Sequence, residues 1–199
     1  MNYKLEKSGT AIGNRIAHQP GAAGILTSTT SASWRDVAKR NFILQMGLDE
    51  PAPAARSRQY SALVFQPKVV LVTIVAGILF QSPVVFVALG AVLWWSALFP
   101  KLNPFSALYN RTIGRLPGAF RLGPAPAPRR AAETEAGAIA LTIALLILAG
   151  FALAAYVFEA ILLTASLAVL IGSFCTGAFM YHLARGRWEF VRQTLPWAN

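Results

Sequence analysis

Cys175 and His182 are the two side chains in the apolar regions of this sequence whose types and spacing could carry chemistry. Seven residues apart on one helix, they would share roughly the same face about two turns from each other. A thiol can enter disulfide exchange, and a histidine inside a membrane helix can ligate haem iron or the magnesium of a chlorophyll. We therefore treat Cys175 as a candidate redox residue and His182 as a candidate pigment or haem ligand. The simpler interpretation of His182 is contact with water or a lipid phosphate.

The sequence offers little else for catalysis or metal binding. Cys175 is the one cysteine, which excludes an intramolecular disulfide, and two ligands are too few for a structural zinc site. We find no glycine-rich phosphate loop, no paired carboxylates in the apolar segments and no Ser/His/Asp set. The sequence therefore predicts a protein that is not an enzyme and has no certain cofactor. Contact with bound lipid, a chlorophyll-type pigment or a carotenoid stays open.

Small residues occupy one face of the same apolar segment. Thr164, Ala168, Gly172 and Thr176 recur every four residues, with Gly177 beside the last. Lipid gives helices no hydrophobic reason to associate, so a groove of small residues lets two backbones approach and pack. We expect this face to pack within a helix bundle or to dock another subunit.

The composition that surrounds these residues is that of a membrane protein. Of 199 residues, 55% are hydrophobic and only 13% are charged, and the mean hydropathy is +0.50. A soluble domain has about a quarter of its residues charged. Three segments contain no Asp, Glu, Lys or Arg, namely 69–100, 136–158 and 160–184.

These segments predict an all-α membrane protein with four transmembrane helices arranged as two antiparallel hairpins. About 20 apolar residues are needed to cross the hydrocarbon. Gln81-Ser82-Pro83 divides the first apolar region, because proline favours the first turn of a helix. The first hairpin is then 59–100. The second is 136–184, with a tight turn at Tyr156–Glu159 between its two spans.

Lys68 lies inside the first predicted span. At the centre of a membrane helix a lysine costs about 2.5 to 3.5 kcal/mol, but nearer an end its ammonium group can reach the headgroups. Such snorkelling is the simpler interpretation, and the alternative is a buried partner for a carboxylate or cofactor.

The formal charge of +10 indicates orientation. Seventeen of the eighteen Lys and Arg residues lie before the first span, in the central loop or after the last span, and the predicted hairpin turns have none. Positive loops stay in the cytoplasm, so both termini are predicted there, in a bacterial inner membrane. Anionic lipid of the cytoplasmic leaflet is the expected counterion, and nucleic acid is not an expected partner.

The segments outside the predicted bilayer contain amphipathic helices. The N-terminal extension, 1–58, includes a helix near 34–46 that begins in a capping-box pattern at Ser33 and stops at Gly47. The central loop, 101–135, begins with an amphipathic helix at 104–116 and continues in a proline-rich connector. The C-terminal tail is 185–199. Five residues are predicted interfacial anchors at the cytoplasmic surface: Trp94, Trp95, Arg111, Arg115 and Trp188.

Several short motifs resemble a family of small bacterial integral-membrane proteins catalogued only as a domain of unknown function. They are Asp49-Glu50 with Arg56, Asn103-Pro104, Arg129-Arg130, and Phe174-Cys175-Thr176-Gly177-Ala178 with Tyr181. The likeness covers about 48–186. In that family the last motif is usually Phe-Cys-x-Gly-Cys, and some members look associated with thiol or sulfur-transfer proteins. Here Ala178 stands at the second cysteine position, and a single sulfur cannot form a dithiol pair.

Together these features predict a non-catalytic accessory subunit that anchors and bridges other subunits of a large bacterial inner-membrane complex. Photosynthetic reaction-centre or light-harvesting assemblies and respiratory assemblies are the expected hosts. The alternative is a membrane thiol-redox or sulfur-handling protein that acts through Cys175. A small transporter would need polar residues at the bilayer midplane, where Thr73 and Thr142 are the main candidates.

Overall fold

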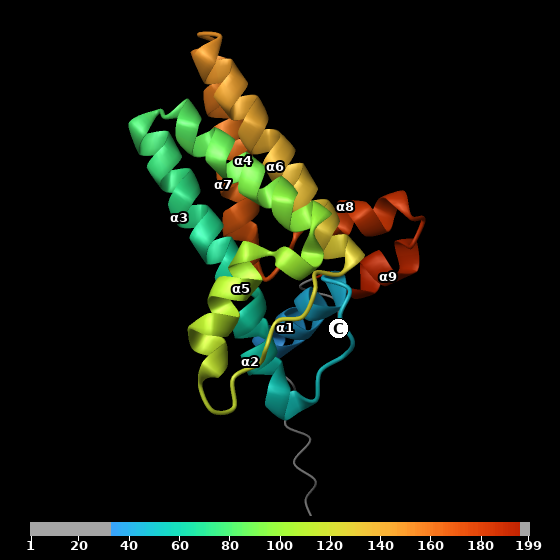
Figure 1. Ribbon diagram of the computed structural model, residues 1–199. Coiled ribbons are helices and arrows are strands. Elements are labelled where there is room, and N and C mark those ends of the chain that lie inside the picture. Colours follow the sequence, from blue (N-terminus) through green and yellow to red (C-terminus); the bar gives the residue numbers. More distant parts are fainter. Residues whose placement is uncertain (1–32, 196–199) are drawn as a thin grey trace, which may run out of the picture. The chain divides into compact units, whose positions relative to one another are not determined.

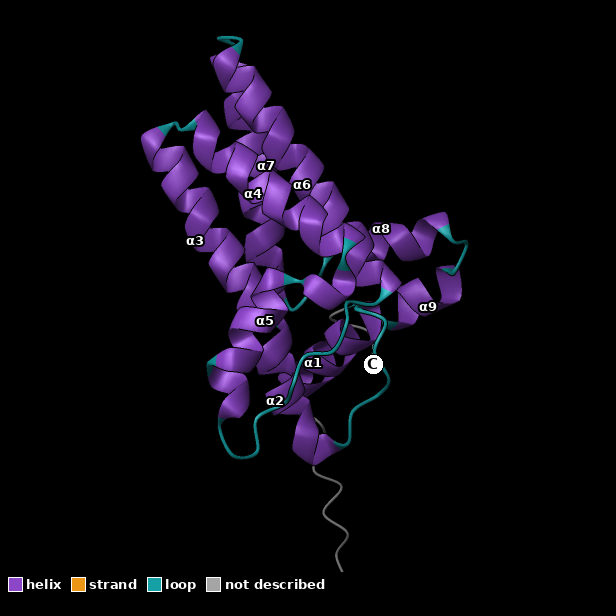
Figure 2. Ribbon diagram, in the orientation of Figure 1, coloured by secondary structure: helices purple, strands orange, loops and turns teal. Residues whose placement is uncertain are grey.

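The computed structural model describes residues 33–195, and all regular structure within that range is helical (Figure 2). This confirms the all-α prediction for these residues. Residues 1–32 of the predicted extension and 196–199 of the tail lie outside the described range. The helices are α1 (Trp34–Gln45), α2 (Pro53–Leu63), α3 (Phe65–Phe80), α4 (Pro83–Leu98), η1 (Pro100–Leu102), α5 (Pro104–Arg111), η2 (Ile113–Arg115), α6 (Ala127–Leu148), α7 (Ala152–Gly172), α8 (Thr176–Ala184) and α9 (Trp188–Gln193).

Three helical segments are long and apolar enough to cross a membrane. They are Pro53–Phe80, in which Val64 alone separates α2 from α3, and the helices α6 and α7. The apolar helix α4 has 16 residues, a length of about 24 Å against roughly 30 Å of hydrocarbon. By length and composition, the described part of the chain therefore contains three candidate spans and one shorter apolar helix.

Glycines allow α4 and α6 to approach each other closely. A Cβ atom added at Gly137 of α6 would clash with Cδ1 of Trp94, and one added at Gly90 of α4 would lie 2.6 Å from Cγ of Leu141. The Trp94 indole Nε1 also donates to the carbonyl of Thr134 at 3.1 Å. Only glycine leaves room for these contacts, so the two glycines determine how closely the helices pack.

An apolar core fills the space between α3, α4, α6 and α7. Its buried members from these helices are Val70, Ile74, Phe86, Leu89, Leu93, Ala140, Ile143, Ala144 and Leu162. Large apolar side chains also cover the outer faces, among them Leu79, Leu145 and Leu153. A helix that is apolar on both its inner and outer faces suits a lipid environment.

The turn between α6 and α7 lies earlier than predicted. It spans 149–151, so the predicted turn at Tyr156–Glu159 is wrong. Gly150 adopts φ +78° just after α6, and a left-handed glycine at this position ends a helix. Glu159, whose charge suggested a turn, is buried in α7 and accepts a hydrogen bond from Nε2 of Gln81 at 3.2 Å.

The predicted fourth span, 160–184, is not one helix. The chain breaks between α7 and α8, where Ser173 adopts a left-handed φ of +51° and its Oγ lies 2.8 Å from Oη of Tyr60. Cys175 precedes α8 and His182 lies in its last turn, so neither belongs to a candidate span. The prediction that both lie on one continuous helix, the fourth span, is therefore wrong.

Two further boundaries differ from the prediction. α6 begins at Ala127 and not near 136. The charged residues Arg129 and Glu133 lie inside its first turns as an i, i+4 ion pair, so they do not belong to the preceding loop. α5 ends at Arg111 and not at 116, and the chain then passes through η2. The connector that follows is held to α5 by Asn110, whose amide both donates to and accepts from the backbone of Leu122.

At the N-terminal side, α1 covers the segment in which a helix was predicted. Gly47 has φ +78° and ends it, as the sequence indicated. The capping box is not formed, because the Ser33 side chain makes no capping hydrogen bond.

Candidate functional site

Both ends of the described chain meet at the end of the bundle opposite the turns at 81–82 and 149–151 (Figure 1). We call the three helices α1, α8 and α9 the platform. Asn41 and Gln45 of α1 are each 1% exposed. Nδ2 of Asn41 donates to the carbonyl of Leu195 at 2.9 Å, and Nε2 of Gln45 donates to the carbonyl of Thr194 at 2.6 Å. These buried amide hydrogen bonds hold α1 against the residues that follow α9.

Gln45 also contacts the two residues that the sequence singled out. Its side-chain Oε1 accepts the backbone N–H of Cys175 at 3.3 Å. Its backbone carbonyl lies 3.1 Å from Nε2 of His182. Gln45 thus connects the turn before α8, the end of α8 and the C-terminal residues. The platform is therefore held together by buried hydrogen bonds that apolar side chains surround.

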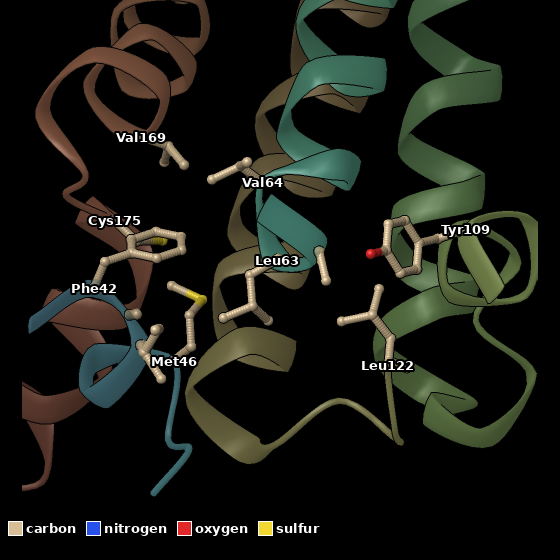
Figure 3. Close-up of a cluster of buried hydrophobic side chains, with 11 residues drawn as sticks. Phe42, Met46, Leu63, Val64, Tyr109, Leu122, Val169 and Cys175 are labelled. Atoms are coloured by element: carbon tan, nitrogen blue, oxygen red, sulfur yellow. The ribbon is translucent and has the colours of Figure 1, made fainter. Parts of the chain in front are cut away.

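The thiol of Cys175 is buried among apolar side chains. It belongs to a cluster that includes Phe42, Met46, Leu63 and Val169 (Figure 3). Burial raises the pKa of Cys175 to about 11. Reactive cysteines occupy electropositive, partly exposed sites with a lowered pKa, so these surroundings do not favour Cys175 as a redox residue.

The imidazole of His182 is enclosed by the platform. Because a carbonyl can only accept, the hydrogen bond to Gln45 places the proton on Nε2. Nδ1 is buried and has no hydrogen-bond partner among the described residues, and the ring packs on Phe190 with centroids 4.5 Å apart. Burial lowers the pKa of His182. Neither nitrogen faces open space, which does not favour ligation of a haem or pigment.

A buried ionic network lies where α3, α5 and α6 meet. Nε of Arg129 is 3.4 Å from Oε1 of Glu133, and the side chains of both residues are less than a tenth exposed. The other end of the Arg129 guanidinium donates to Oε1 of Gln66 at 2.5 Å. Nδ2 of Asn103 donates to Oε1 of Glu133 at 3.1 Å, while its Oδ1 caps the start of α5. The network joins three helices and satisfies most of its own polar groups.

A cavity of about 130 Å³ lies between this network and the platform. Its polar lining includes Gln66, Arg129, Glu133 and Glu135. The remaining wall is mainly apolar, with residues from α1, α3, α6 and α7 and the turn before α8. A mostly apolar cavity with a few convergent polar groups is the usual form of a small-molecule site, and this cavity is the candidate functional site of the described chain.

The structure separates the predicted groove of small residues into two parts. Thr164, Ala168 and Gly172 belong to α7, and Thr164 is exposed, whereas Thr176 and Gly177 lie beyond the break in α8. The i+4 stripe on a single helix is therefore wrong. Gly177 packs against α6, where an added Cβ would lie 2.7 Å from Cα of Ala132, so its small size serves packing within the chain.

The predicted anchors all reach the surface. Trp94 and Trp95, near the end of α4, are about half exposed, Trp188 of α9 is 65% exposed, and Arg111 and Arg115 are exposed at the end of α5 and in η2. Lys68 is exposed as well, and among residues 33–195 no salt bridge joins it to a carboxylate, which suits snorkelling.

Sequence reasoning missed the residues that hold the platform together and those that line the cavity. Asn41, Gln45 and Gln66 are isolated amides whose importance comes from partners far along the chain. A signal did exist for Arg129 and Glu133, since opposite charges four residues apart at the start of an apolar helix indicate an intrahelical pair.

The chain belongs to the family described as "Domain of unknown function (DUF4395)", whose model matches residues 61–185. The match includes α3 to α8, the ionic network and the Cys175 turn, and excludes α1 and α9. No curated protein and no solved structure matches the chain.

Proposed function

We propose that this chain is a non-catalytic integral-membrane subunit that anchors and bridges neighbouring subunits of a large bacterial inner-membrane complex, in a photosynthetic or respiratory assembly. The observation that carries the proposal is the surface of the platform. The platform lies outside the candidate spans, is held together by buried hydrogen bonds, and exposes large apolar side chains. Trp34 is 66% exposed, Met180 is 53% exposed and Trp188 is 65% exposed. Exposed apolar residues on a well-ordered surface are typical of a site that another protein or the membrane interface covers.

The proposed arrangement in the membrane has four helices in two hairpins, α3 with α4 and α6 with α7. The two connecting turns, 81–82 and 149–151, contain no charged residue and lie at the same end of the bundle (Figure 1). The described cations gather mainly toward the other end, in the platform, α2 and the segment from η1 to the start of α6. Positive charge on the cytoplasmic side would place the platform, both termini and the anionic-lipid contacts there.

The shorter helix α4 suits this arrangement for a local reason. Trp94 and Trp95 near its end are partly exposed, and indole rings prefer the headgroup level. A helix of about 24 Å can end inside the interfacial region when such anchors follow it.

Gentle solubilisation of native membranes followed by native mass spectrometry tests the proposal. A bridging subunit should be recovered at fixed stoichiometry in a particle much larger than its own 21.4 kDa. A chain that is monodisperse and alone after extraction in several mild detergents would overturn it.

A further inference from the structure

The cavity reaches the surface at Glu135 of α6, which belongs to its lining and is exposed. A Cβ atom added at Gly177 would lie 2.8 Å from Oε2 of Glu135, which places this carboxylate against the first turn of α8. Within residues 33–195, Glu135 forms no hydrogen bond or ion pair. Its carboxylate is therefore available to a ligand that enters the cavity.

The charged residues of the lining lie on two different sides of α6. Successive helical residues are rotated by about 100°, so Glu135 lies about 120° around the helix from Arg129 and about 160° from Glu133. Ala132 and Ala136 project between these two sides and line the cavity as well. An apolar strip thus separates the buried ion pair from the carboxylate at the opening.

The charge of the lining favours a cation. The lining contains one cationic side chain, Arg129, and two carboxylates, Glu133 and Glu135, so its net charge is −1. Arg129 and Glu133 pair with each other. Arg130, the other cation of α6, donates to the carbonyl of Ala97 on α4, and the start of α8 offsets at most about half a charge. The opening therefore attracts cations and repels anions.

The apolar part of the cavity has the size and lining for one ring. Its volume of about 130 Å³ is close to that of an engineered cavity of roughly 150 Å³ that holds benzene. Phe42, Met46 and Val169 belong to the lining (Figure 3). Phenylalanine rings and methionine sulfur both make favourable contacts with aromatic rings, so this wall suits a ring.

We propose that this cavity binds a small lipophilic amine in its cationic form. The apolar body, about the size of one aromatic ring, occupies the cavity beside Met46, and the ammonium group lies at the carboxylate of Glu135. This site is independent of the proposed bridging function, because it uses none of the exposed apolar residues of the platform.

The test compares two ligands that differ in charge. 4-Fluorobenzylamine and 4-fluorobenzyl alcohol have the same ring, but only the amine is cationic at pH 7. Their binding to the full chain in phosphatidylcholine nanodiscs is measured by ¹⁹F NMR, and partitioning into empty nanodiscs is subtracted. We expect saturable binding of the amine that is about fivefold tighter than that of the alcohol, the upper range for an exposed ion pair.

Two carboxylate variants locate the ammonium group. Glu135→Gln should make the two ligands bind equally. Glu189→Gln is the matched control, since Glu189 is exposed on α9 and does not line the cavity, and it should leave the preference for the amine unchanged. Equal affinity for the two ligands in the unaltered chain, or a preference that survives Glu135→Gln, would overturn the proposal.

Two variants of α7 locate the ring. Ala165 lines the cavity and Ala160 is exposed on the same helix, so Ala165→Leu should abolish binding of both ligands and Ala160→Leu should leave it unchanged. Amine binding that survives Ala165→Leu would place the ring elsewhere and would also overturn the proposal. If Ala165→Leu does not fold, the ligand pair with Glu135→Gln decides alone.

Discussion

The backbone N–H of Cys175 donates to Oε1 of Gln45 at 3.3 Å, across 130 positions of the sequence. This bond places the Phe174–Ala178 motif against α1, which lies outside the matched family region. Because the same glutamine donates to the carbonyl of Thr194, the motif, α1 and the C-terminal residues depend on one side chain. In this chain the motif therefore acts as a structural joint between the bundle and the platform.

Replacing Gln45 by leucine should loosen the platform. The change leaves the Thr194 carbonyl and the Cys175 N–H buried without partners, at a cost of about 1 to 3 kcal/mol for each unsatisfied group. Hydrogen exchange of 34–45 and 188–195 should accelerate while the spans stay protected. Gln193→Leu is the matched control, since Gln193 is exposed and bonds to Glu189 at the surface. Equal protection in the two variants would contradict the role of Gln45.

Replacing Gly177 by alanine should destabilise the contact between α8 and α6. The new methyl group would lie 2.7 Å from Cα of Ala132, a backbone atom that cannot rotate away, and such overpacking costs about 1 to 3 kcal/mol. Gly123→Ala serves as the control, because nothing lies within 4 Å of its added methyl group. The comparison is made by chemical denaturation in detergent, and a Gly177→Ala variant as stable as Gly123→Ala would show that α8 does not pack as described.

The Cys175 thiol should be almost inert in the folded protein. With a pKa of about 11, about 0.1% is thiolate at pH 8, and the side chain is buried as well. Alkylation by iodoacetamide at pH 8 should be at least about a hundredfold slower than in denaturant. A folded-state rate close to that of the unfolded chain would revive the thiol-redox interpretation.

The raised pKa of Cys175 also predicts that the folded protein loses stability at high pH. The folded state holds the Cys175 proton up to about pH 11, whereas an unfolded thiol loses it near pH 8.5. Between these values the folded state binds more protons, so this contribution to the unfolding free energy is complete below the unfolded pKa and is lost as pH rises toward 11. Cys175→Ala should show a flatter dependence from pH 8 to 10 in denaturation experiments.

His182 should make the platform sensitive to mild acid. Burial lowers its pKa, while the unfolded chain binds the proton near pH 6.5. Below pH 6.5 the unfolded state therefore binds more protons, and stability is lost as pH falls from that value toward the folded pKa. Hydrogen exchange of α1 between pH 5 and 7.5, corrected for the intrinsic rate, should show this loss in the unaltered chain and in His18→Gln, but not in His182→Gln. A loss that persists in His182→Gln would assign the sensitivity to another group.

The sequence predicted best the features that depend on one or two local residues. Pro83 at the start of α4 and Gly47 at the end of α1 are examples, because proline and glycine act through their own backbone. Errors arose where a charged residue was assumed to lie outside the bundle. Glu133 and Glu159 are both buried inside helices, with partners at the ends of other helices that no local pattern reveals. Gly150 was the missed local signal for the true turn.

The cavity and the platform were not predictable for the same physical reason. Gln45, Gln66 and Asn103 act through tertiary hydrogen bonds, and an isolated amide in a sequence carries no information about its partner. The predicted residues Cys175 and His182 do lie close to this region, but as buried parts of its framework.

Site-specific photo-crosslinking in native membranes tests the bridging function most directly. A photoreactive benzoylphenylalanine replaces either Trp188, which is 65% exposed on the platform, or Leu153, which is 79% exposed on the outer face of α7. The proposal predicts a discrete protein adduct of reproducible mass from position 188 and only lipid adducts from position 153. Lipid adducts alone from both positions would contradict it and would make the platform a membrane-surface anchor without a protein partner.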